Sequence, residues 1–213
     1  MAFRRLPTAS CLLEVERKFR ALKIRKLTQH GGIPHFRSLQ KLSVEIIRDS
    51  YYDKSNMLSS AGAWVRKRNG EWQAKIKKGG NFTNSRFQEL SHIDEIEAHV
   101  KRVVGIGGAT SNFGLQPVAT FSTTRESWIA DGEFRIVLDT TDFDHQVGEV
   151  ELQKVLVGNN GDDAPDELRQ QREMQLMDEK IVTFMQTYAW AFSVGEPKGK
   201  LTAYFELLRT QDN

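Results

Sequence analysis

Charged residues in several segments of this chain occupy every second position, with one sign predominating in each segment. In the first segment Glu14, Glu16 and Lys18 alternate with apolar residues, and Gly148-Glu149-Val150-Glu151-Leu152 repeats the acidic alternation far along the chain. Successive side chains of a β-strand point to opposite faces, so each segment would place its charges on one face and its apolar side chains on the other. This period predicts strands, with two pairs of carboxylates on the polar face.

A pair of neighbouring segments carries positive charge in the same alternation. The shared polar face holds Trp64, Arg66, Arg68, Gln73, Lys75 and Lys77. Between the two segments lies Asn69-Gly70, which supplies the positive φ angles of a type I′ hairpin turn. A soluble sheet has reason to interleave opposite charges, because like charges on neighbouring strands repel. The separation of acidic from basic strands therefore indicates a binding surface.

The alternation extends over most of the chain and predicts an α+β barrel. Eight strands are expected: Leu12–Arg20, Leu42–Tyr52, Ala61–Arg68, Glu71–Lys77, Arg86–Leu90, Pro117–Trp128, Glu133–Leu138 and Gly148–Val157. Asp131-Gly132 predicts a second tight turn. Helices are expected at Lys23–His30, at Ile93–Val104 behind a Ser91 cap, as one or two helices within Asp166–Tyr188, and at Lys200–Arg209 with an apolar stripe of Leu201, Tyr204, Phe205 and Leu208.

Length and composition narrow the class of protein. The 213 residues suit one domain spanning 1–213, and 30 basic against 28 acidic residues argue against a general nucleic-acid binder. Membrane spanning is not expected, because no run of about 20 apolar residues occurs. The N-terminal segment Met1–Pro7 is not followed by the apolar run of an export signal, and Cys11 is a lone cysteine. We therefore expect a cytoplasmic monomer.

The charge pattern favours chemistry on a phosphate group. Two pairs of carboxylates suit a hard divalent cation such as Mg²⁺ or Mn²⁺, which prefers oxygen ligands. Arginines and lysines opposite them suit an anion that the same metal can bridge. A phosphate-binding glycine loop is not expected, because Gly105-Ile-Gly107-Gly108 lacks the Lys-Ser/Thr that would follow.

Glu14-Val-Glu16-Arg-Lys18 resembles the E-x-E-x-K signature of the triphosphate tunnel metalloenzymes, also called the CYTH superfamily. Further segments follow in the order of that family: Asp49-Ser-Tyr51-Tyr52-Asp53, Trp64-Val-Arg66-Lys-Arg68, Trp72-Gln-Ala-Lys75, Glu89-Leu90, Thr124-Arg125, Leu138-Asp139-Thr-Thr-Asp142-Phe143, Gly148-Glu149-Val-Glu151 and Lys200-Leu201. Several of them are similar to the members that hydrolyse thiamine triphosphate.

The resemblance implies a closed eight-stranded antiparallel barrel whose inward charges line a tunnel, with a C-terminal helix near it. It implies metal-dependent hydrolysis of a small triphosphate, thiamine triphosphate in the first place. The implied metal ligands are Glu14, Glu16, Glu149 and Glu151, which also count as catalytic. The implied phosphate-binding residues are Lys18, Arg66, Arg68, Lys75, Arg125 and Lys200, and Glu89 would line the tunnel. Trp64 would stack on the thiamine ring.

One position departs from the family pattern. Similar enzymes carry a metal-binding aspartate where this chain has Val137, and Asp139 shares that face of the strand two residues on. Asp139 is therefore a candidate replacement ligand, either direct or through a water. Tyr51 matches a tyrosine that would assist the tunnel lysine, here Lys75, as an acid–base pair.

Three other functions remain open at this point. An inorganic triphosphatase would use the same tunnel on tripolyphosphate without reading an organic group. An adenylate cyclase activity also occurs in the superfamily. The missing acid at Val137 would suit a non-catalytic module that binds polyphosphate or a nucleotide.

Overall fold

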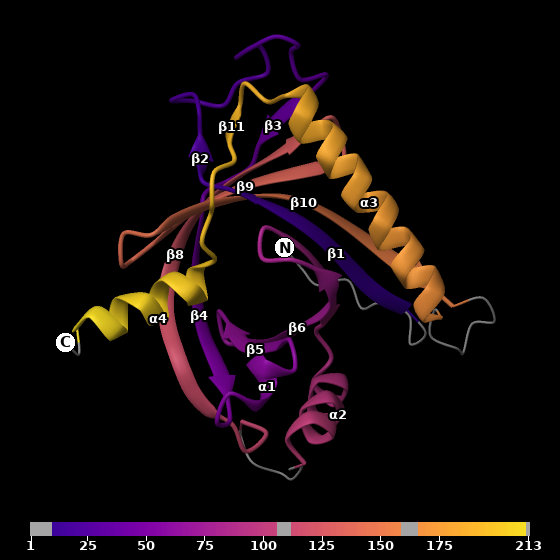
Figure 1. Ribbon diagram of the computed structural model, residues 1–213, viewed down its shortest axis with the longest axis vertical. Coiled ribbons are helices and arrows are strands. Elements are labelled where there is room, and N and C mark those ends of the chain that lie inside the picture. The colour runs from indigo at the N-terminus through magenta and orange to yellow at the C-terminus, as the bar shows by residue number, and fades with distance from the viewer. Residues whose placement is uncertain (1–9, 106–111, 159–165, 212–213) are drawn as a thin grey trace.

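Eight strands close into an antiparallel barrel (Figure 1). The structure is a computed structural model in which residues 10–105, 112–158 and 166–211 are described. Neighbours around the ring are β8-β4-β5-β6-β7-β1-β10-β9, and β9 pairs with β8 to complete it. The strands are β1 (Ser10–Phe19), β4 (Glu45–Asp53), β5 (Ala63–Arg68), β6 (Glu71–Gly80), β7 (Asn84–Leu90), β8 (Gln116–Ala130), β9 (Phe134–Thr141) and β10 (Gln146–Val157). The predicted strands and fold class are confirmed.

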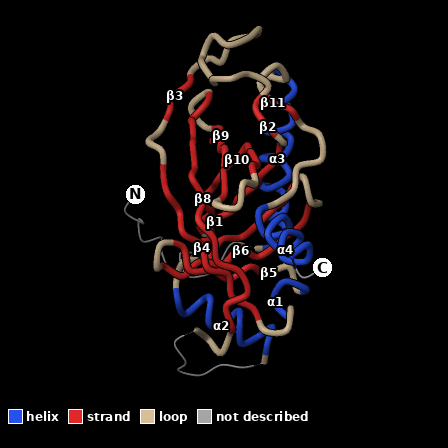
Figure 2. The backbone as a smooth tube through the Cα atoms, turned by 90° about the vertical axis from the view of Figure 1, so that its left-hand side faces the viewer, coloured by secondary structure: helices blue, strands red, loops and turns tan. Residues whose placement is uncertain are grey.

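Shorter elements and helices surround this ring. β3 (Leu39–Lys41) pairs with the end of β8, and β2 (Ala21–Leu22) pairs with β11 (Phe192–Ser193). The helices are α1 (Met57–Ser60), α2 (Ile93–Val104), α3 (Glu167–Thr187) and α4 (Lys200–Gln211). Figure 2 shows α1 and α2 together at one end of the molecule, with α3 running beside the strands.

The two larger hydrophobic cores lie outside the barrel, between its strands and the helices. The outward side chains of β1 and β10, such as Val15 and Val150, pack with Met174 and Ile181 of α3. A second core joins the outward face of β5 and β6 to α1 and α2. The inward positions are thereby left for polar side chains, although the interior of a small barrel is commonly filled by apolar ones.

Both predicted tight turns are present. Asn69 and Gly70 have φ angles of 50° and 91°, and Asp131 and Gly132 have 52° and 82°. These left-handed pairs join β5 to β6 and β8 to β9, as expected for type I′ hairpins.

The helix predicted at Lys23–His30 is wrong, because this segment is irregular. Residues near the C-terminus hold this segment and the residues that follow it: the Lys23 N–H donates a hydrogen bond of 2.9 Å to the carbonyl of Ala191, and the Trp190 Nε1 donates one of 2.9 Å to the carbonyl of Pro34. The Trp190 indole also lies against Gly32, where a Cβ atom would come within 2.1 Å of the ring. A contact across more than 150 residues thus overrides the local helical periodicity.

The other helices follow the prediction with two corrections. α2 has the predicted bounds, but His92 stands at its N-cap and no side-chain cap bond forms, so the Ser91 cap is wrong. α3 is one helix, capped by Asp166. α4 buries only part of its apolar stripe, because Phe205 and Leu208 remain more than one-third exposed.

None of these described helices has the length and apolarity to cross a membrane. Residues 1–9 and 106–111, with most of the Gly105–Gly108 segment, lie outside the described residues.

Candidate active site

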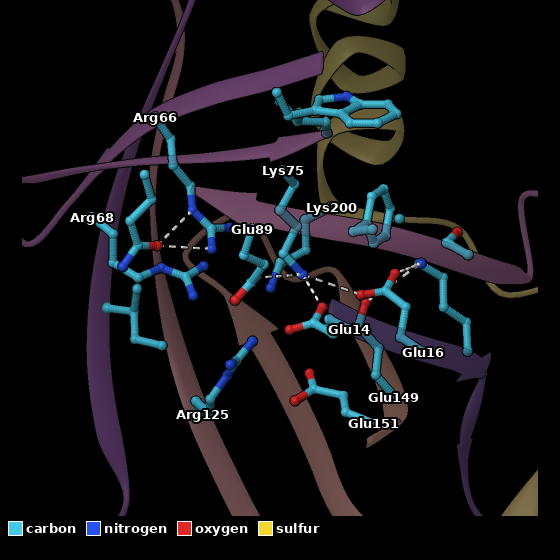
Figure 3. Close-up of a pocket in the computed structure, with 18 of the residues that line it drawn as sticks. Glu14, Glu16, Arg66, Arg68, Lys75, Glu89, Arg125, Glu149, Glu151 and Lys200 are labelled. Atoms are coloured by element: carbon cyan, nitrogen blue, oxygen red, sulfur yellow. Dashed lines mark hydrogen bonds and ion pairs between the residues drawn. The ribbon is translucent and has the colours of Figure 1, made fainter. Parts of the chain in front are cut away.

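A cavity of about 940 Å³ runs inside the barrel. Its lining comes from alternate positions of the strands and from the start of α4, in agreement with the inward faces predicted from the two-residue period. Figure 3 shows that the labelled acidic and basic side chains converge on this space. Two of the strand pairs give the cavity its charge and are called below the acidic wall and the basic wall.

The acidic wall consists of Glu14 and Glu16 of β1 and Glu149 and Glu151 of β10. The antiparallel register places Glu16 opposite Glu151 and Lys18 opposite Glu149, so the four carboxylates share one face of the sheet. All four glutamates are at most 8% exposed. Burial raises the pKa of Glu151 to about 8, and the charge of Glu14 adds to the rise, because both disfavour another negative charge.

The basic wall consists of Arg66 and Arg68 of β5 and Lys75 of β6. Arg68 donates two hydrogen bonds to Asp49, at 2.8 and 2.7 Å, and Arg66 donates to Gln73 at 3.2 and 3.0 Å. Burial tends to raise the pKa of Asp49, yet the hydrogen bonds from Arg68 and the charge of Arg66 bring it below the usual value. Asp49 and Gln73 thus fix both guanidinium groups in place.

Two lysines pair with the acidic wall: Lys75 reaches it from the basic wall, and Lys18 lies on β1 beside the glutamates. Lys75 forms an ion pair with Glu14 and lies 3.3 Å from Glu16 and 3.5 Å from Glu89. Lys18 forms an ion pair with Glu16. Burial lowers the pKa of Lys75, but Glu14 and Glu16 raise it well above its usual value. Lys75 therefore stays protonated and acts as a cation at neutral pH.

A third cluster surrounds Asp139 on β9. Arg125 donates two hydrogen bonds of 2.7 Å to its two carboxylate oxygens, and Lys200 at the start of α4 pairs with one of them. Burial would raise the pKa of Asp139, but Lys200 and Arg125 bring it far below its usual value. Val137 is fully buried and directly opposite Glu149. Asp139 thus serves as an anchor for two cations, and both of its oxygens are engaged.

The acidic wall has oxygen ligands of the kind that suit a divalent metal. Four carboxylates on adjacent strands offer hard oxygen ligands on one face of the sheet. Among the described residues, however, no three acidic, histidine or cysteine side chains form a ready metal cluster. Glu14 and Glu16 are instead held by the two lysines, and Asp139 lies in the separate cluster with Arg125. A metal would have to displace the lysines.

Aromatic side chains lie at the α4 side of the cavity. Trp64 packs edge-to-face on Phe87, with ring centroids 5.7 Å apart, and both rings line the cavity. The Tyr51 hydroxyl accepts a hydrogen bond of 3.3 Å from Arg66. Among the described residues no hydrogen bond joins that hydroxyl to Lys75, and the acid–base pair of Tyr51 and Lys75 stays a prediction.

Several residues of the cavity or its support carry no role in the sequence prediction, among them Asp49, Gln73 and Arg135. Asp49 anchors Arg68, Gln73 anchors Arg66, and Arg135 lines the cavity beside Glu151. Strand alternation places each of them on an inward face, so their position can be predicted from the sequence. Strand alternation does not give the cross-strand register, which decides which inward side chains contact one another.

Comparisons with known proteins agree with this geometry. The CYTH domain profile matches residues 12–184. Thiamine-triphosphatase from Homo sapiens is 32% identical over 165 residues, covering 67% of this chain and 69% of the human protein. The Macaca fascicularis thiamine-triphosphatase is 30% identical over the same shares. The solved structure of the PH1819 protein from Pyrococcus horikoshii OT3 is similar in fold, with a TM-score of 0.52, 20% identity and coverage of 93% of this chain and 99% of that one.

Proposed function

The chain belongs to the CYTH domain family, and from that premise we propose that it hydrolyses thiamine triphosphate to thiamine diphosphate and orthophosphate with Mg²⁺. The family and the relatives named thiamine-triphosphatase support a triphosphatase-type enzyme. The observation that carries the specific proposal is the closed barrel with an acidic wall facing a basic wall across one cavity.

The basic residues of the cavity bind the phosphate chain. Arg66 and Arg68 are held rigidly by Gln73 and Asp49, so little side-chain freedom is lost when they grip an anion. Arg125, Lys18, Lys75 and Lys200 add positive charge around the same space. Trp64 stacks on the organic cation, an interaction of roughly 0.5–2 kcal/mol.

The acidic wall holds the metal in this proposal. Glu14, Glu16, Glu149 and Glu151 are the ligands, and Mn²⁺ is a second suitable ion. Bound metal supplies charge that neutralises the phosphate oxygens. Lys75 pairs with Glu14, and Lys18 pairs with Glu16. Metal binding by these two carboxylates would leave both ammonium groups available to phosphate.

The proposed reaction is an in-line displacement at the terminal phosphorus. A water oriented by Glu149 and Glu151 attacks, a new bond joins its oxygen to phosphorus, and the bond to the bridging oxygen breaks. The proton that the attacking water loses passes to solvent. The leaving diphosphate keeps the electron pair of the broken bond, and the neighbouring guanidinium groups stabilise its charge. Lys75 acts here as a fixed cation, consistent with its raised pKa.

A phosphate-release panel tests the proposal. Thiamine triphosphate, tripolyphosphate and ATP are each incubated with the protein, with and without Mg²⁺. Mg²⁺-dependent release that is fastest for thiamine triphosphate is expected. Faster release from tripolyphosphate would make the chain an inorganic triphosphatase, and binding without any release would make it a non-catalytic module.

A further inference from the structure

Arg135 stands at the rim of the tunnel, on the side away from α4. It is the second residue of β9, and Glu45 on the same rim is the first residue of β4. Both line the cavity, and their side chains are 29% and 46% exposed, as expected at an opening. At the α4 side Trp64 and Leu201 both pack against the apolar cluster of Tyr51, Ala119 and Phe121, so the two sides of the tunnel differ in chemistry.

The guanidinium of Arg135 has unused hydrogen-bonding capacity. Its nitrogens lie 3.9 Å from Glu151 and 3.8 Å from Glu45, beyond hydrogen-bond distance. Its Nε is buried and has no hydrogen-bond partner in the described part of the chain. Arg68 and Arg125 differ, because each already donates two hydrogen bonds to a carboxylate.

A phosphate group fits this unused capacity. Guanidinium presents a planar fork of donors that matches two phosphate oxygens, and a buried donor without a partner gains most from such a ligand. If the organic group of the substrate sits at Trp64, the phosphate chain points away from α4 and toward Arg135. Glu45 and Glu151 hold the guanidinium loosely in the meantime.

We propose that Arg135 is a further phosphate-binding residue, which binds the terminal phosphate of a triphosphate in the tunnel. The inference rests on the proposed function, because it takes the tunnel to be the triphosphate site. Arg135 would then distinguish substrates by the length of their phosphate chain, because a triphosphate anchored at Trp64 reaches Arg135 and a diphosphate anchored there does not.

Calorimetric binding to the full chain tests this inference with two ligands in Mg²⁺ buffer. The first is an analogue of thiamine triphosphate with a methylene group in place of the oxygen that bridges to the terminal phosphate, which cannot be hydrolysed at that bond, and the second is thiamine diphosphate. Arg135→Gln is expected to lower the affinity for the analogue by about tenfold or more, since the substitution removes a charged hydrogen-bond donor. The affinity for thiamine diphosphate should change by less than about twofold, because that ligand gains little from the distant guanidinium.

Two variants serve as controls, and a third replaces the test variant if that variant does not fold. Arg48→Gln makes the same change on the exposed outer face of β4 and should leave both affinities unchanged. Glu45→Gln removes the loose partner of Arg135 and should preserve or strengthen analogue binding, whereas a merely structural ion pair would make it as damaging as Arg135→Gln. If Arg135→Gln does not fold, Arg135→Lys decides, because lysine lacks the fork and should bind the analogue less tightly than arginine.

The outcomes separate this inference from the proposed function. Unchanged analogue affinity in the Arg135 variants, an equal loss for both ligands, or the same loss in Glu45→Gln would overturn the role of Arg135. A wild-type chain that binds the analogue through Arg135 but releases no phosphate from thiamine triphosphate would overturn the hydrolase proposal alone. A wild-type chain that does not bind the analogue would overturn both.

Discussion

Replacing Asp178 by asparagine should weaken the attachment of the long helix α3 to the barrel without changing a residue of the tunnel. Asp178 accepts hydrogen bonds from Asn84 at 2.7 Å, Arg86 at 2.9 Å and Arg17 at 3.2 Å. The donors lie on the outer faces of β7 and β1, so one carboxylate joins the helix to two strands. Burial tends to raise the pKa of Asp178, but these hydrogen bonds lower it below its usual value.

The size of the effect follows from the two charged donors. A hydrogen bond to a charged group contributes about 1.5–3 kcal/mol, and the arginines are 28% and 23% exposed, which favours the lower end. The asparagine carbonyl retains one neutral hydrogen bond of about 1 kcal/mol. The net loss in free energy of unfolding at pH 7 is therefore about 2 kcal/mol, or roughly 4–8 °C in Tm for a chain of this size.

Urea unfolding of wild type and Asp178→Asn between pH 7 and pH 3 measures this difference. A carboxyl whose pKa is lowered in the folded state stabilises the protein above its unfolded pKa of about 3.9 and loses that contribution as pH falls further. The gap between the two proteins should be constant from pH 7 to about pH 5 and should narrow toward pH 3.

Glu173→Gln on the same helix is the matched control. Its partner Lys154 is 48% exposed, so this surface pair should contribute less than about 1 kcal/mol. The reasoning is refuted if Asp178→Asn is no less stable than this control at pH 7. It is also refuted if the gap to wild type does not change between pH 5 and pH 3.

Three further changes test the site and the barrel. Glu14→Gln should abolish phosphate release while leaving the Tm within a few degrees of wild type; retained release in the phosphate assay would remove Glu14 from the metal site. Trp64→Ala should lower kcat/KM for thiamine triphosphate but not for tripolyphosphate, and equal losses would favour the inorganic triphosphatase. Gly148→Ala should lower stability by about 1–3 kcal/mol in urea unfolding, because its Cβ would come within 2.0 Å of the fully buried Phe19 ring; wild-type stability would contradict that packing.

The two-residue period was sufficient to predict the barrel and its inward faces. Glu14 and Glu151 share a polar face with their neighbours because strand alternation is a local property of the backbone. Asn69-Gly70 likewise predicts its own turn. These features depend on residues close together in sequence, so sequence reasoning identifies them.

Features that depend on distant segments were missed. The indole of Trp190 packs against Gly32, and the N-cap residue of α2 is His92, one residue after the predicted Ser91. Tyr51 and Lys75 lie on nearby strands but take different partners, Arg66 and Glu14. Register and side-chain partner choice decide these points, and neither can be read from one strand at a time.

The pairing of β1 with β10 has a consequence for the chain during its synthesis. β1 is the first barrel strand made and β10 the last, so a nascent chain displays the complete basic hairpin of β5 and β6 long before Glu149 and Glu151 exist. A product that terminates before Gln146 would keep the cations of that hairpin with only half of the carboxylates that oppose them. Such a fragment would attract polyanions indiscriminately and have no means of cleaving them.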